Sequence, residues 1–162
     1  TDAFPCAPEA GIATSGPLEG QIDKGFPGNI GNVTWRLAPP KAVNKFGMVD
    51  LRKAVGDQTH AMAYAYTQIH SDKDRQYAIE VRHDDMIAVW LNGEKVFVST
   101  QSDPSYITRK LVKVDFDKGT NHLLVKLTQK KNYWEFCTRI RQLNNRTASV
   151  YGLPVEPLVE KK

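Results

Sequence analysis

Short runs of alternating apolar and polar residues, each closed by turn-forming residues, occupy most of the chain. The clearest pair, 86–91 and 94–99, is joined by Asn92-Gly93. Both residues tolerate the positive φ angles of a two-residue hairpin turn, so the sequence predicts two antiparallel strands here. Further strands are expected at 33–38, 46–51, 60–70, 76–83, 110–116, 122–129 and 132–140. Many short strands separated by turns favour a sandwich or a barrel.

The strands have two chemically different faces. In the run 60–70, Met62, Tyr64 and Tyr66 share one face, and the alanines share the other. Two such sheets bury their apolar faces by packing against each other. The alternation therefore predicts an all-β fold, an antiparallel β-sandwich, in which only 51–57 is compatible with a turn of helix.

A length of 162 residues suits one domain. We place the β-sandwich at 32–151. Residues 1–31 are rich in Gly, Pro and Ala and predict an extended N-terminal arm packed on the domain, and 152–162 predict a tail or linker. The chain begins with Thr-Asp-Ala instead of Met, which we interpret as a processed chain or a piece of a larger protein.

The charge of the chain is mildly basic, with 22 Lys and Arg against 18 Asp and Glu. Nucleic-acid binders usually cluster their basic residues, and no long basic run is present here, so we expect no nucleic-acid partner. We also expect no membrane span, since no apolar run approaches the ~20 residues that a span requires. A mild basic excess indicates either a solvated surface or attraction to an anionic polymer such as an acidic polysaccharide.

The sequence contains none of the common catalytic motifs, so we expect no enzyme. Glu80 and Glu135 form the one carboxylate pair considered for glycoside hydrolysis, and we interpret both as solvent-facing strand residues. Asp84 and Asp85 are candidate calcium ligands, but two acids alone do not specify a site, and turn formation is the favoured explanation for them. Beyond such a calcium ion, we expect no cofactor, and the four histidines have no metal-ligand spacing.

Cys6 and Cys137 are the two cysteines of the chain. They are either two thiols or one disulfide, which an oxidising compartment would favour. Such a disulfide would tie the N-terminal segment to a late strand, and closing so long a loop would stabilise the fold by ~4–5 kcal/mol.

Aromatic residues beside polar ones are the most informative candidates for a binding site. Sugar rings have apolar faces that stack on flat aromatic side chains, while their hydroxyl groups take hydrogen bonds from charged or amide groups. Trp90 and Trp134 lie in strong strands, which favours the interior, and Tyr64 and Tyr66 either line a sheet face or fill the core. The aromatic candidates are Trp35, Tyr106, Tyr133 and Trp134.

The segment HDDMIAVWLNGEKVFV and the later segment VDFDKGTNHLLVKLTQKKNYWEFCTRI resemble a recurrent module of secreted bacterial proteins. Asp84-Asp85, the run Trp90 to Glu94 and the run Lys118 to Lys126 match its turns and strands, and the resemblance covers roughly 60–141. These modules are similar to carbohydrate-binding domains attached to polysaccharide-degrading enzymes. The resemblance implies a β-sandwich of jelly-roll type.

The resemblance implies a non-catalytic carbohydrate-binding module of a secreted or extracellular multidomain protein, with a periplasmic location as a variant. Its partners would be a polysaccharide and a neighbouring domain of the parent protein. Arg82, Asp84, Asn92 and Arg139 would then bind hydroxyl or acidic groups of the sugar. The alternative is a structural or protein-interaction domain of an extracellular assembly. A small esterase or glycosidase is disfavoured, because the sequence shows no nucleophile with an adjacent base.

Overall fold

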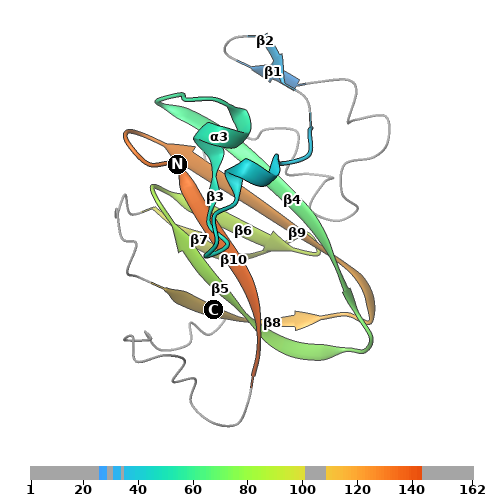
Figure 1. Cartoon of the computed structure of the whole chain (residues 1–162). Coiled ribbons are helices and arrows are strands. Elements are labelled where there is room, and N and C mark those ends of the chain that lie inside the picture. Colours follow the sequence, from blue (N-terminus) through green and yellow to red (C-terminus); the bar gives the residue numbers. More distant parts are fainter. Residues whose placement is uncertain (1–25, 29–30, 34, 101–108, 144–162) are drawn as a thin grey trace.

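Two antiparallel four-stranded sheets form the body of the computed structural model (Figure 1). The structure describes residues 26–28, 31–33, 35–100 and 109–143, with the backbone alone for 26–28 and 31–33. The first sheet has the order β3 (Val49–Asp50), β10 (Glu135–Gln142), β5 (Arg75–His83) and β8 (Lys110–Phe116). The second has the order β4 (Ala61–Ser71), β9 (Gly119–Gln129), β6 (Ile87–Leu91) and β7 (Glu94–Ser99). The predicted antiparallel β-sandwich is therefore confirmed.

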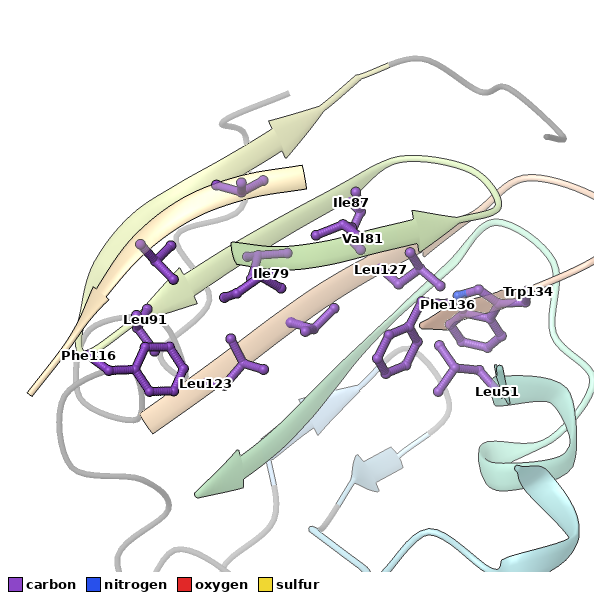
Figure 2. Close-up of a cluster of buried hydrophobic side chains, with 14 residues drawn as sticks. Leu51, Ile79, Val81, Ile87, Leu91, Phe116, Leu123, Leu127, Trp134 and Phe136 are labelled. Carbon is purple, nitrogen blue, oxygen red and sulfur yellow. The ribbon is translucent and has the colours of Figure 1, made fainter. Parts of the chain in front are cut away.

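The core lies between the two sheets (Figure 2). Ile79 and Val81 of β5 contribute to it from the first sheet, and Leu123 and Leu127 of β9 from the second, all at most 2% exposed. Alternate residues of a strand point to opposite faces. Each strand that supplies this core therefore also supplies an outer face to the molecule, and the candidate sites lie on these outer faces.

The hairpin predicted from Asn92-Gly93 joins β6 to β7. Asn92 has a φ of 50° and Gly93 a φ of 87°, as a two-residue turn of this kind requires. The register of this pair shifts between Val89 and Trp90, which marks a bulge.

A short helix and a 3₁₀ turn precede the long strands. Helix α3 (Leu51–Val55) lies where 51–57 was expected to form a helical turn, and the Asp50 carboxylate caps it by accepting a hydrogen bond from the backbone N–H of Arg52. The 3₁₀ turn η1 spans Pro40–Ala42. Among the residues described, no helix is long and apolar enough to cross a membrane.

The earliest strands differ from those expected. β1 (Phe26–Gly28) and β2 (Gly31–Val33) form a separate hairpin across the expected boundary between the arm and the sandwich. The expected strand at 33–38 thus ends at Val33, and the one at 46–51 shortens to β3. The rest of the predicted arm, 1–25, and the predicted tail lie outside the described residues.

Candidate functional site

The outer face of the β4-β9-β6-β7 sheet carries a cluster of aromatic side chains, which we call the aromatic face and define as Trp35, Tyr64, Tyr66, Trp90 and His122. Tyr64 and Tyr66 lie two residues apart on β4, so they share the face opposite the core. The rings of Trp35 and Tyr66 meet edge to face with centroids 6.4 Å apart. Trp35, Tyr64 and Tyr66 are all half-buried, so each ring keeps part of its surface accessible.

A row of paired residues across the sheet supports these rings. Tyr66 pairs with Leu124, Leu124 with Trp90, and Trp90 with Lys95, which crosses all four strands. Leu124 is fully buried and Trp90 is 6% exposed, although both lie on the outer side of the sheet. The aromatic face therefore has two layers. Buried Leu124 and Trp90 lie beneath, and they support the half-buried rings above them.

Cations lie against the aromatic face. The Nζ atom of Lys126 lies 5.7 Å from the centroid of the Tyr64 ring, and that of Lys95 lies 5.5 Å from the Trp90 ring. Both distances suit a cation–π contact. The face thus combines flat rings with hydrogen-bond donors, as the recognition of a sugar requires.

His122 connects the aromatic face to the turn between β6 and β7. Its Nδ1 atom lies 2.7 Å from the hydroxyl oxygen of Tyr66, and its backbone N–H donates to the side-chain oxygen of Asn92. The Asn92 amide nitrogen donates to the side-chain oxygens of Asn121 and Asp117. Asn92 was expected to bind a ligand. In the structure both polar atoms of its side chain hydrogen-bond within the turn, and its role toward a ligand stays a prediction.

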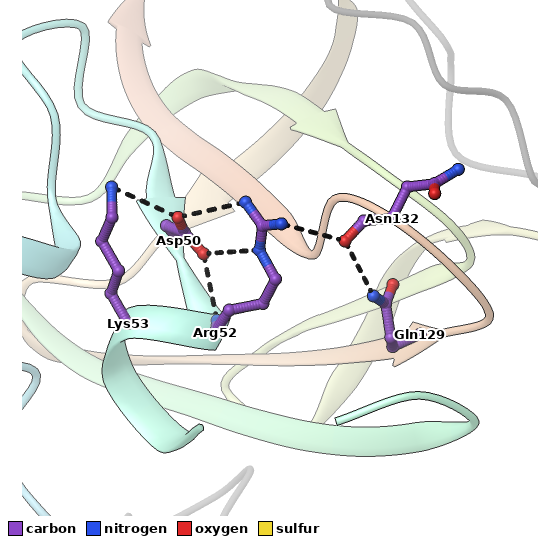
Figure 3. Close-up of polar contacts among 5 residues, drawn as sticks. All are labelled: Asp50, Arg52, Lys53, Gln129 and Asn132. Atoms are coloured by element: carbon purple, nitrogen blue, oxygen red, sulfur yellow. Dashed lines mark hydrogen bonds and ion pairs between the residues drawn. The ribbon is translucent and has the colours of Figure 1, made fainter. Parts of the chain in front are cut away.

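Tyr133 lies in a different region, at the turn that precedes β10. The residue is 46% exposed, and the guanidinium carbon of Arg52 lies 5.2 Å from the centroid of its ring. Figure 3 shows that Arg52 is itself held by Asp50 and by the backbone oxygen of Asn132. Tyr133 is therefore accessible, as expected, but the structure does not group it with the aromatic face.

Two expected site residues lie in the interior. Trp134 is 1% exposed and packs in the core between the sheets (Figure 2), so we withdraw it as a surface ligand of sugar. Asp84 is 8% exposed and interacts within the protein. The backbone N–H of Asp84 also donates to the carbonyl of Glu135, which fixes this turn against β10. Because Asp84 is buried and also interacts within the protein, we withdraw it as a ligand-binding residue.

The Asp84-Asp85 turn has a structural explanation. Asp85 has a φ of 62°, and its carboxylate accepts a hydrogen bond from the backbone N–H of Lys130. In the described part of the chain, no three or more His, Cys, Asp or Glu side chains form a group that could hold a metal ion. The calcium site considered from the sequence thus gains no support here.

Arg82 and Arg139 both lie on the outer face of the other sheet near Glu80, Arg82 two residues along β5 and Arg139 directly opposite Glu80 on β10. Glu80 is 2% exposed, which corrects the expectation that it faces solvent. Its carboxylate accepts hydrogen bonds from Arg82 at 3.1 Å and from Arg141 at 2.8 and 2.9 Å. Burial alone would raise the pKa of Glu80, but Arg141 and then Arg82 outweigh it and lower the pKa below its ordinary value.

Cys137 lies beside Arg82 in the strand pairing, and its free thiol is 1% exposed. Burial raises the pKa of this thiol, which makes it a poor nucleophile. Cys6, its expected disulfide partner, and Tyr106 lie outside the described residues. The structure has Cys137 as a free thiol, the first of the two alternatives considered, and the role of Tyr106 stays a prediction.

A small open hollow of about 240 Å³ lies where β5 begins and β10 ends, lined by Arg75, Gln76, Gln142 and Leu143. It presents a guanidinium and two amides but no carboxylate, imidazole, hydroxyl or thiol. The hollow therefore lacks a general base or a nucleophile.

No known family, characterised protein or solved structure matches this chain. The resemblance of 60–141 to modules of secreted bacterial proteins therefore stays an expectation. Sequence reasoning had noted Tyr64 and Tyr66 as residues of a sheet face but had not placed them in the site. Their spacing of two residues in a strand indicated that they share a face. The cross-strand pairs that connect Tyr66 to Leu124 and Trp90 could be identified only from the pairing of the strands.

Proposed function

We propose that the protein is a non-catalytic carbohydrate-binding module that binds a polysaccharide on its aromatic face. The observation that carries the proposal is the set of half-buried rings of Trp35, Tyr64 and Tyr66 on one sheet face, above a buried layer that fixes them. Rings held in fixed positions lose little entropy when a ligand binds. A sheet face also offers an extended surface, which suits a polymer better than a small molecule enclosed in a pocket.

The strand connections support the jelly-roll type within this proposal. From β3 to β10 the chain passes to the other sheet at every step except the β6–β7 hairpin. Eight strands in two sheets suit a jelly roll, an architecture found in lectin domains. A secreted or extracellular multidomain parent, with a neighbouring domain as partner, belongs to the same proposal.

A second candidate, a protein-interaction domain, is favoured by a different observation. Leu37, Val43 and Phe46 precede β3 and are 95%, 45% and 62% exposed. Asn44 accepts hydrogen bonds from the backbone N–H groups of Phe46 and Met48, which holds Phe46 at a tight turn. Exposed apolar side chains on an ordered turn are typical of a surface that docks on a neighbouring domain.

Affinity gel electrophoresis against a panel of neutral and acidic polysaccharides tests the first proposal. We expect at least one neutral polymer to retard the protein. Tyr64→Ala and Trp35→Ala should lower the affinity at least tenfold, whereas Tyr64→Phe should keep it because stacking needs the ring and not the hydroxyl. Phe46→Ala is the matched control, since it removes an exposed ring outside the aromatic face.

Two outcomes would contradict the proposal. One is that no polymer retards the folded protein, which would favour the protein-interaction candidate. The other is that Phe46→Ala lowers the affinity as much as Tyr64→Ala. A circular dichroism melt of each variant would separate lost binding from lost folding.

A further inference from the structure

The outer face of the β3-β10-β5-β8 sheet concentrates guanidinium groups. Inward residues of β5 and β10, such as Ile79 and Phe136, belong to the core, so the alternate residues of both strands lie on the outside. Arg82 pairs with Cys137, Arg139 with Glu80, and Arg141 with Ala78. Neighbouring strands lie about 4.8 Å apart, and residues two apart in one strand about 7 Å, so these charges lie within the reach of a single sugar unit or its neighbour.

The charges on this face are unequal. Both carboxylate oxygens of Glu80 are occupied by Arg82 and Arg141. No carboxylate in the described part of the chain pairs with Arg139, whose guanidinium lies near Gly47 and the Cys137 thiol. Glu80 therefore bonds two of the three guanidinium groups, and the three arginines outnumber the one acid among them, which leaves this cluster with a net positive charge.

Arg109 gives an independent observation. It directly precedes β8, whose first residue, Lys110, pairs with Val81. Continued alternation places Arg109 on the same face as Leu111 and at the level of Arg82. Arg109 is only 6% exposed, yet its Nε and Nη2 atoms have no hydrogen-bond partner in the structure. A buried guanidinium without an acceptor is costly, so this position calls for an anionic group from a ligand.

We propose that this face, which we call the arginine face and define as Arg82, Arg109, Arg139 and Arg141, is a second binding site for the carboxylate or sulfate groups of an acidic polysaccharide. Guanidinium groups bind such oxyanions with paired hydrogen bonds. The choice of a polysaccharide over an acidic protein rests on the proposed function, and the choice of an anionic group rests on the arginines alone. The site is separate from the aromatic face, because it lies on the opposite sheet.

Isothermal titration of the whole chain with polygalacturonate and with dextran sulfate tests this site, with unmodified dextran as the neutral polymer. We expect one of the two acidic polymers to bind, with an affinity that falls as salt is added. Arg139→Gln and Arg109→Gln should each lower that affinity at least fivefold. The matched control is Lys131→Gln, which removes the same charge from an exposed turn and should change the affinity less than twofold.

The outcomes separate the two proposals. Tyr64→Ala should leave the affinity for the acidic polymer unchanged and lower the affinity for the neutral polysaccharide. The proposal for one face can therefore be disproved without affecting the proposal for the other. Equal losses in Arg139→Gln and Lys131→Gln would overturn the site, since they would show attraction to net charge alone. Absence of binding to both acidic polymers would overturn it too. If poly-glutamate bound more tightly than either acidic polysaccharide, and Arg139→Gln abolished that binding, the choice of a polysaccharide as the ligand would be wrong. The partner would then be an acidic protein.

Discussion

The two outer faces of the sandwich arise from the same alternation along β-strands, yet different interactions stabilise them. On the aromatic face, Trp90 and Leu124 are buried beneath half-buried rings. On the arginine face, the buried outward residue is Glu80, which is held by charged hydrogen bonds. Apolar packing depends little on pH or salt, whereas a carboxylate among guanidinium groups depends on both. The two faces should therefore respond to different perturbations.

The largest effect is expected from Trp90→Ala. Removal of a buried indole leaves a cavity, so the free energy of unfolding should fall by about 3 kcal/mol or more. The loss should be the same at pH 5 and pH 7, which urea denaturation at both values would show. Val98→Ala, on the same sheet but 57% exposed, should change stability by less than ~0.5 kcal/mol. A loss below ~1 kcal/mol in Trp90→Ala would show that the indole is not packed as described.

Glu80→Gln should be the next most costly change, by about 2 kcal/mol at pH 7, because it removes the charge that compensates Arg82 and Arg141. The lowered pKa of Glu80 fixes the pH dependence. Its contribution is complete above the ordinary value of 4.5 and is lost as the pH falls through the lower folded value. The difference between wild type and variant should therefore close in acid.

Asp115→Asn is the control for Glu80→Gln. Asp115 lies in the same sheet, is exposed and accepts a hydrogen bond from Gln76. Its replacement should have little effect at any pH. A Glu80→Gln variant with the same stability gap at pH 3 and pH 7 would contradict the charge network.

Tyr66→Phe measures the polar contribution to the aromatic face. The change keeps the ring and removes only the hydroxyl group, which lies 2.7 Å from His122 Nδ1. We expect a loss of about 1 kcal/mol in thermal or urea unfolding, since one hydrogen bond is removed and packing is kept. A loss as large as that of Trp90→Ala would mean that the hydrogen bond, and not packing, orders this face.

The smallest effect, and one of opposite sign, is expected from Glu135→Gln. Burial, and then the charges of Asp50 and Asp84, raise the pKa of Glu135 above its ordinary value. A carboxylate with a raised folded pKa costs stability at neutral pH, and this cost disappears as the pH falls through that value. The variant should thus be slightly more stable than wild type at pH 7 and equal to it in acid. Chemical denaturation at pH 7 and in acid measures this difference. A variant that is less stable than wild type at pH 7 would contradict the predicted sign.

Sequence reasoning predicted the parts of the fold that depend on neighbours in the chain. β7 and β8 fall at their expected residues, and Asn92-Gly93 forms the expected turn. Contacts between distant segments were harder to predict. Glu80 is buried because Arg141 lies 61 residues later on the paired strand, and no local pattern reveals that pairing.

In the candidate site, too, local features could be predicted from the sequence and contacts between distant segments could not. Tyr64 and Tyr66 could be assigned to one face from their spacing, but their support by Trp90 requires the register of three strands. Trp134 has the alternation of a core residue, and its polar neighbours in sequence made it a candidate as well. Pairing of the strands decided between these two interpretations.

The most direct test of the account is an NMR titration of the labelled protein with an oligosaccharide cut from the polymer that the protein retains. We predict that the largest shift changes fall on Trp35, Tyr64, Tyr66 and their neighbours on β9, with the Trp35 indole N–H among them. Changes confined to the turn of Phe46 or to Tyr133, or an unchanged spectrum at saturating sugar, would contradict the assignment of carbohydrate binding to the aromatic face.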